Sequence, residues 1–292
     1  MEAKEYIKNI LNSLDEHHGR LGELKGMFYH LDILFNRHVH DIGEALAAET
    51  NLQKKQVLRS YLSISDVTGE ESLNGGVEVQ NINSNYRVNE ENFKQEMELM
   101  RFRQAGYTIA QAYESLMTFM KDCAITAYHE DSLLPAYLVT GVPEKRQATL
   151  VTRFLNRSAG NAVYITFLSK IYPFFGNSLT VNRRKFHYGK FLMVLEFVRD
   201  KFTHSLGNII KSDKQYSRIM GDQDKRVILL HLFPLAWHDD QAAFQLDFPL
   251  AEYVLQLIAE ISFQLYKAIC MQNNIAWKRH YNPRTQLHEA VL

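Results

Sequence analysis

The chain has 292 residues, of which 46% are hydrophobic and 23% charged, and its 33 Lys and Arg balance 33 Asp and Glu. These ordinary values exclude wholesale disorder and collagen-like repeats, and a chain of this length buries a core without a disulfide or a structural metal. The balanced charge excludes a global attraction to nucleic acid or membrane, so any basic binding surface has to be local.

The cysteine content and the apolar stretches indicate the compartment. Cys123 and Cys270 are too few for a disulfide framework or a four-cysteine zinc site. Residues 1–6 are charged and lack the apolar region of a secretory signal. The stretches 161–175 and 227–237 are interrupted or too short to span a bilayer. We therefore expect a soluble, cytoplasmic protein that makes no membrane contact.

The first segment, residues 1–66, is predicted to be helical. Its apolar residues recur at helical spacing, at Ile7, Ile10, Leu11 and Leu14 and then at Leu21, Leu24, Phe28, Leu31 and Phe35. Residues 67–89 are rich in Ser, Asp, Gly, Asn and Glu, which predicts a loop or a short hairpin after Gly75-Gly76. This change in composition places a domain boundary before residues 90–292.

Residues 90–292 are predicted to form a second helical domain. Helices are expected at 90–124, 144–171, 187–209 and 249–269. Short strands are expected only at 227–232 and 244–248. The predicted fold class is therefore all-α, a helical bundle with an additional N-terminal helical segment.

The helix expected at 187–209 carries residues suited to chemistry. On an ideal helix Glu196, Asp200 and His204 lie opposite the apolar stripe, with Arg199 at its edge. A histidine can take the proton of an RNA 2′-hydroxyl or supply one to the leaving oxygen. An arginine donates to the phosphate, where negative charge increases in the transition state. The set suits metal-independent RNA cleavage, with Asp200 orienting His204 and Glu196 in support.

A basic cluster lies just before this helix. We expect RNA phosphates to be bound by Arg183, Arg184, Lys185, Lys190 and Lys201. The chain contains neither a P-loop nor a dinucleotide-binding glycine motif, which argues against an ATPase, a kinase or a dehydrogenase.

The run Glu196-Phe-Val-Arg199-Asp200-Lys-Phe-Thr-His204-Ser205 resembles the Arg-polar-x3-His motif of the HEPN superfamily. The resemblance covers residues 90–272 and implies an all-helical endoribonuclease of a defence or toxin–antitoxin system. It further implies a homodimer in which two Arg/His sets face each other across an RNA-binding cleft. Arg199 would be the phosphate ligand and His204 the acid/base, with no metal and no cofactor. An antitoxin or another defence-system subunit is the implied protein partner.

Two alternatives remain open. The neutral charge and the N-terminal helices also fit a non-catalytic subunit that binds RNA or protein. The order His40-Asp41-Ile42-Gly43 resembles the His-Asp pair of HD-type metal-dependent phosphohydrolases, with His17 and His18 as upstream ligands. The pattern departs from that family because no suitable His and Asp follow downstream and Glu44 stands where the family has Lys.

Overall fold

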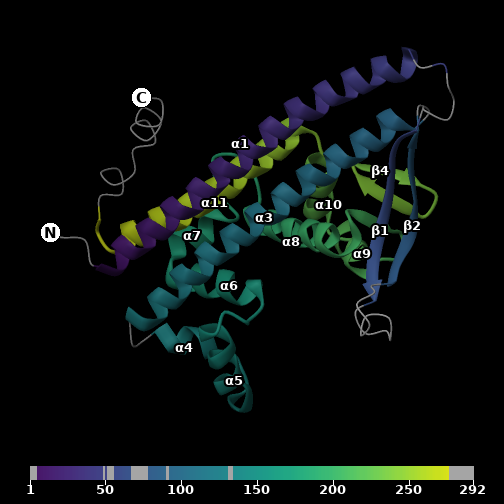
Figure 1. Ribbon diagram of the computed structural model, residues 1–292. Coiled ribbons are helices and arrows are strands. Elements are labelled where there is room, and N and C mark those ends of the chain that lie inside the picture. Colours follow the sequence, from purple (N-terminus) through teal and green to yellow (C-terminus); the bar gives the residue numbers. More distant parts are fainter. Residues whose placement is uncertain are drawn as a thin grey trace. The chain divides into compact units, whose positions relative to one another are not determined.

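A computed structural model describes residues 5–48, 50, 56–66, 78–89, 92–130 and 134–275 (Figure 1). These residues are mostly helical, which confirms the coarse prediction of a helical fold, and they also include a two-stranded and a three-stranded sheet. The chain divides into two compact units, one made of residues 1–28 with 103–292 and the other of residues 29–102. The boundaries between the units fall inside two long helices.

The first unit contains the N-terminal part of α1 (Glu5–Ala48) and most of α3 (Phe93–Glu130). Its other helices are α4 (Leu134–Val139), α5 (Glu144–Leu155), α6 (Asn161–Ile171), α7 (Pro173–Ser178), α8 (Tyr188–Ser205), α9 (Lys214–Met220), α10 (Gln223–Leu232) and α11 (Phe248–Gln272). Its strands β3 (Asn208–Ile210), β4 (Leu235–His238) and β5 (Gln241–Phe244) form an antiparallel sheet in the order β3-β5-β4.

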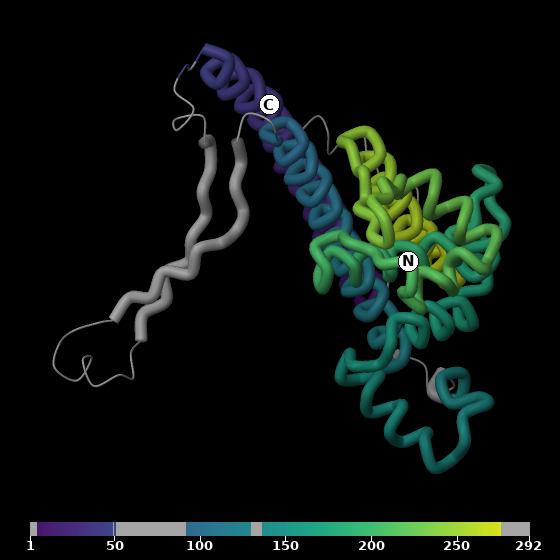
Figure 2. The backbone as a smooth tube through the Cα atoms, turned by 90° about the vertical axis from the view of Figure 1, so that its right-hand side faces the viewer, coloured from purple at the N-terminus to yellow at the C-terminus, as the bar shows by residue number. Residues whose placement is uncertain are grey.

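Helix α11, yellow in Figure 2, supplies many buried residues to the core of the first unit. It begins where the Asp247 carboxylate accepts a hydrogen bond of 2.9 Å from the Leu250 N–H. Its core-facing residues are Val254, Leu257, Ile258, Ile261 and Leu265, all with no exposed surface. Each such side chain stabilises the fold by roughly 1.5–3 kcal/mol. By length and composition α11 could cross a membrane, but 61% of its most apolar window is buried, as in a core helix.

Two histidines of α1 are held in the first unit between α3 and α11. His17 Nδ1 lies 2.8 Å from Ser115 Oγ, and the His17 ring stacks on Phe119. His18 Nε2 lies 2.9 Å from Ser262 Oγ on α11. Burial, and secondarily the charge of His18, lowers the pKa of His17 to about 3, and burial also lowers the pKa of His18. Both rings are therefore neutral at pH 7.

The free energy of unfolding is expected to fall as the pH drops below about 6.5. The unfolded chain takes up a proton on His17 near its ordinary pKa of about 6.5, whereas the folded chain does not until about pH 3. Each such histidine then lowers the free energy of unfolding by up to about 1.4 kcal/mol for each pH unit below 6.5. Urea unfolding between pH 7.5 and 5 measures this slope, which should decrease in His17→Leu and stay unchanged in the exposed control His238→Leu. Equal slopes in both variants would contradict this role of His17.

The helix predicted from Glu144 to Ile171 is divided into α5 and α6, so its predicted continuity is wrong. Arg157 adopts a left-handed conformation with φ of 58°, and the Ser158 N–H donates to the Arg153 carbonyl at 2.8 Å. This is a helix C-terminal motif that turns the chain away from the helix axis. Gly160 then precedes the first residue of α6. The helix end predicted just before Pro173 is confirmed, because α6 ends at Ile171.

The strands predicted in the second half of the chain need correction. Residues 227–232 belong to α10, which begins where Asp222 accepts a hydrogen bond from the Lys225 N–H. An apolar run of this length is compatible with either a strand or a buried helix. The capping residue Asp222 favours the helix. Of the strand predicted at 244–248, only Phe244 is in β5, and Phe248 begins α11.

The second unit combines the rest of α1 and the start of α3 with a hairpin of β1 (Gln56–Asp66) and β2 (Glu78–Asn89). The strands are antiparallel, with Leu62 opposite Ile82. The predicted helical segment 1–66 is thus wrong over residues 56–66, where Leu62 and Ile64 alternate with serines in a period of two. Of residues 67–89, predicted as a loop or a short hairpin, 78–89 form β2, whose partner strand β1 lies before this range, and residues 67–77 lie outside the described residues.

The helices of the second unit pack through a small core. Leu46 of α1 and Phe93 and Met97 of α3 are buried together. Asp32 and Arg101 form an ion pair of 2.5 Å between the same two helices. This unit therefore has contacts of its own that hold α1 against α3.

Candidate functional site

The candidate site lies in the last turns of α8, and the sequence explains where this helix begins and ends. At its start the His187 Nδ1 accepts a hydrogen bond of 3.1 Å from the Lys190 N–H. At its end Leu206 and Gly207 have φ of 52° and 80°, the left-handed conformation that terminates helices. The helix predicted at 187–209 is therefore confirmed, although it ends at Ser205.

Arg199 is held by two carboxylates. Its Nε lies 2.7 Å from Glu114 Oε1 on α3, and its Nη1 donates to Asp200 Oδ1 at 2.6 Å. The guanidinium carbon lies 5.8 Å from the centre of the Tyr113 ring, within the range of a cation–π interaction. With 22% of its side chain exposed, Arg199 is fixed in one orientation with part of its surface open.

Glu196 takes part in a second set of hydrogen bonds on the same side of α8. It accepts one of 3.2 Å from Asn161 Nδ2 on α6, and the same amide donates to the Tyr113 hydroxyl at 3.0 Å. Burial, followed by the charge of Glu196, raises the pKa of Tyr113 above its ordinary value, so this hydroxyl stays protonated. We refer to Tyr113, Glu114, Asn161, Glu196, Arg199 and Asp200 as the α8 network.

A small cavity of about 190 Å³ opens beside the α8 network. Tyr113 and Glu196 line it together with the apolar side chains of Ile165, Leu192 and Met193. Thr166, His187 and Lys190 also line this cavity, so its wall is mixed in character.

His204 is exposed in the last turn of α8, and it makes no hydrogen bond or ion pair with any residue in the described part of the chain. Asp200 contacts Arg199 and, at 3.5 Å, the Gln215 amide. In this structure Asp200 therefore orients Arg199. We expected from the sequence that Asp200 would orient His204, and this expectation is wrong. The planar guanidinium of the adjacent Arg199 offers a carboxylate several fixed N–H donors, which explains the difference.

The five predicted RNA-binding cations do not form one continuous basic surface. Three of them make ion pairs with carboxylates, Arg184 with Glu260, Lys190 with Asp222 and Lys201 with Asp213. Arg183 and Lys185 are exposed and have no ion pair among the described residues. Sequence reasoning missed these pairs because the carboxylates come from other elements of the fold.

Three residues of the α8 network, Tyr113, Glu114 and Asn161, were not predicted as site residues. Tyr113 belongs to the apolar stripe of the helix expected at 90–124 and is indeed only 1% exposed. Its hydroxyl acquires a polar role only because α6 brings Asn161 to it. Glu114 shows no local signal that it pairs with a residue of another helix.

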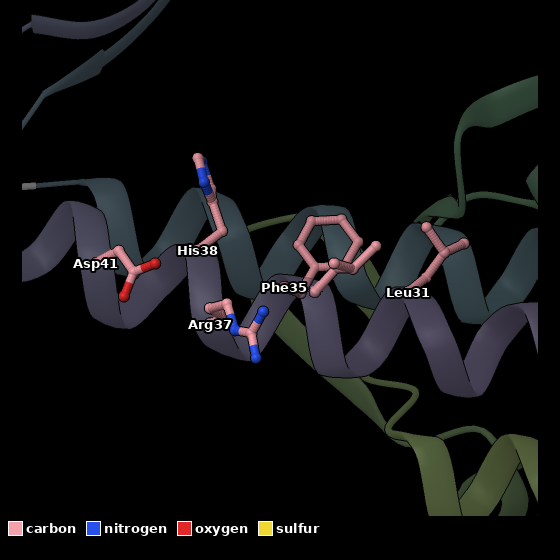
Figure 3. A pocket seen from close by; sticks show the side chains of 6 residues that line it. Leu31, Phe35, Arg37, His38 and Asp41 are labelled. Atoms are coloured by element: carbon pink, nitrogen blue, oxygen red, sulfur yellow. The ribbon is translucent and has the colours of Figure 1, made fainter.

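The structure separates the residues expected for an HD-type metal site. His17 and His18 are bound to serines in the first unit, whereas His40 lies at an exposed position of α1 in the second, 3.4 Å from Asp41. The described residues that line a surface cavity of about 400 Å³ near Asp41 all belong to α1 (Figure 3). Among the described residues, no group of three or more His, Cys, Asp or Glu is placed to hold a metal ion.

A scan of protein-family models, a search of curated proteins and a search of solved structures each found no match to this chain. Function is therefore inferred from the residues of the site itself.

Proposed function

We propose that this protein is a cytoplasmic, HEPN-like, metal-independent endoribonuclease of a defence or toxin–antitoxin system. The observation that carries the proposal is the pairing of a fixed arginine with an exposed histidine at the end of α8. Glu114 and Asp200 hold Arg199 in place, and His204 follows five residues later with no hydrogen bond or ion pair among the described residues. This is the combination needed to bind a phosphate and move a proton beside it.

Arg199 acts as the phosphate ligand. A guanidinium has five N–H donors, and the two ion pairs engage Nε and Nη1 and leave Nη2 for a phosphate oxygen. The Glu114 side chain is 53% exposed, so it can turn into solvent when the phosphate arrives. Asp200 then keeps the guanidinium in position, and Glu196 supports the same region through Asn161 and Tyr113.

His204 acts as the acid/base. It takes the proton of the 2′-hydroxyl as that oxygen attacks phosphorus, and the bond from phosphorus to the 5′-oxygen breaks. The leaving oxygen receives a proton from His204 of a second copy across the cleft of a homodimer. The products are a 2′,3′-cyclic phosphate and a 5′-hydroxyl, and the reaction consumes no cofactor. Exposed Arg183 and Lys185 hold the RNA backbone farther along.

The proposal is tested by incubating the purified protein with total RNA and with tRNA in EDTA. We expect cleavage in the absence of any divalent ion, with cyclic phosphate at the new 3′ ends. Sedimentation of the same sample should show a dimer. Cleavage that requires added Mg²⁺, or products with 3′-hydroxyl ends, would be incompatible with this mechanism.

A second candidate is a non-catalytic subunit that binds a protein partner, such as a neighbouring defence-system subunit or an antitoxin. The observation favouring it is that Arg199 already has two carboxylate partners, as in an ion pair that serves only to stabilise the fold. Apolar side chains on α1 of the second unit also face solvent, with Ile33 43% and Leu34 57% exposed. A stable complex formed by a chain that does not cleave RNA would support this alternative.

A further inference from the structure

Helix α5 presents a strongly basic face in a chain that is neutral overall. Lys145, Arg146 and Arg153 are exposed on it, and none of them forms an ion pair within the described part of the chain. On an ideal helix the three lie within an arc of about 100°. Glu144, the one carboxylate in the sequence of α5, lies outside this arc. We refer to Lys145, Arg146 and Arg153 as the α5 basic face.

Helix stability does not account for two of these cations. Lys145 and Arg146 are in the first turn of α5, where the positive end of the helix dipole disfavours cations. Among the described residues no side chain caps this end of the helix. Only Arg153 is in the last turn, where the dipole favours a cation and where its guanidinium donates to the Ser158 carbonyl at 3.1 Å. Two cations placed against the dipole point to a binding role for this face.

The opposite side of α5 belongs to the core of the first unit. Phe154 has no exposed surface, and its ring centre lies 4.8 Å from that of Tyr164 and 5.1 Å from that of Phe167. The other large apolar residues of α5 pack against the same core, and none of them is exposed. Since an interfacial helix inserts its apolar face into the bilayer, α5 is not suited to bind a membrane.

A phosphate backbone is the partner that fits such a face. The core of a protein interface is formed by aromatic and apolar side chains, and the α5 basic face offers none. A phosphate backbone instead needs cations and hydrogen-bond donors at regular spacing. Lys145 and Arg153 are eight residues apart, about 12 Å along the helix axis, and the exposed Thr149 hydroxyl lies between them. The face can therefore contact several successive phosphates.

The α5 basic face leads along the chain to the α8 network. The turn after α5 is held by an ion pair of 2.5 Å between Arg157 and Asp122 of α3. Asn161, which donates to Glu196 of the network, follows four residues after Arg157. Four residues of chain span at most about 14 Å. An RNA strand held at Arg199 can therefore continue onto α5.

We propose that the α5 basic face binds the phosphate backbone of the RNA whose cleaved phosphate lies at Arg199. The substrate is then an RNA long enough to contact both α8 and α5. The inference rests on the proposed function for the identity of the ligand, but binding at α5 does not require that the chain cleave it.

The test measures binding of the full chain to a single-stranded RNA oligonucleotide whose 2′-hydroxyls are methylated. This RNA cannot be cleaved by 2′-hydroxyl attack, so the measurement reports binding alone. Fluorescence anisotropy at several KCl concentrations gives the slope of the logarithm of the association constant against the logarithm of the salt concentration. Each phosphate contact to a single strand contributes about 0.7 to the steepness of this slope.

The triple variant Lys145→Gln/Arg146→Gln/Arg153→Gln should make the slope shallower by about 2, because three phosphate contacts are lost. It should also weaken binding at least tenfold at about 0.1 M KCl. The double variant Lys145→Gln/Arg146→Gln leaves the hydrogen bond of Arg153 to Ser158 intact and should make the slope shallower by about 1.4. Thermal melting of each variant reports that the fold is intact, as expected for substitutions of exposed side chains.

The matched control removes one lysine and two arginines from exposed positions of α1 and α10, in Lys8→Gln/Arg20→Gln/Arg226→Gln. It should keep the wild-type slope. The same loss of slope in this control would show that RNA responds only to net charge. A wild-type slope in the triple variant, or no RNA binding by the wild type, would also overturn the proposal. Binding of polyglutamate as tight as that of RNA, and weakened by the triple variant, would make the face a docking surface for an acidic protein.

The result on α5 is separate from the result on cleavage. Cleavage in EDTA by a chain whose triple variant keeps the wild-type slope would leave the proposed function in place and remove α5 from it. A shallower slope in the triple variant of a chain that does not cleave RNA would support binding at α5 and contradict the ribonuclease.

Discussion

Replacing His204 with alanine is expected to lower the rate of RNA cleavage in EDTA by about 10²–10⁴-fold, the usual contribution of a general acid/base. Thermal stability should be unchanged, because the side chain is exposed and contacts no described residue through a hydrogen bond or an ion pair. The rate is measured from single-turnover cleavage of tRNA, and stability from the midpoint of thermal unfolding.

The matched control is His238→Ala, an exposed histidine of β4, which should cleave at the wild-type rate. Normal cleavage by His204→Ala would assign the activity to another site or to a contaminant. Loss of cleavage accompanied by unfolding would instead make His204 a structural residue.

Replacing Gly106 with alanine is expected to destabilise the protein by about 1–3 kcal/mol, the typical cost of overfilling a core. Intrinsic helix preference acts in the opposite direction, since alanine is favoured over glycine in a helix by about 1 kcal/mol. The added Cβ would lie only 1.9 Å from the tip of the Phe202 ring, where a side chain cannot fit. The steric term therefore outweighs the propensity.

The Phe202 ring has little room to move aside. It is 2% exposed, stacks on Phe244 at 5.2 Å and meets the edge of Tyr107 at 5.9 Å. Gly207, with φ of 80°, also lies against it. Urea unfolding of Gly106→Ala, Phe202→Leu and the double variant tests the contact. The double variant should be more stable than the sum of the two single effects predicts, whereas simple additivity would show that the two residues do not interfere.

Much of the helical framework could be predicted from the sequence because its signals are local. The apolar stripes of α8 and α11 repeat with the helical period, and Asp247 caps α11 with its own side chain. Where two local signals compete, prediction failed. The turn at Arg157 divided one predicted helix, and an apolar run read as a strand is part of α10.

The candidate site was predictable only as a set of residue types on one helix. That Arg199, Asp200 and His204 share the end of α8 follows from their spacing. Which of them are in contact does not follow from the spacing, because each charged side chain turns toward its strongest partner, and some partners come from other helices. Asp200 is bound to Arg199, and His204 is left exposed.

The sequence by itself determined a neutral, mostly helical chain with an Arg-Asp-x3-His order on an amphipathic helix. Only the tertiary structure decided which partner each charged side chain binds. Glu260, 76 residues after Arg184, neutralises that arginine, and Glu114 of α3 reaches Arg199. The tertiary structure likewise buries His17 as a neutral ring between helices. The physical reason is that ion pairing and desolvation depend on distances between elements, which packing sets and local periodicity does not encode.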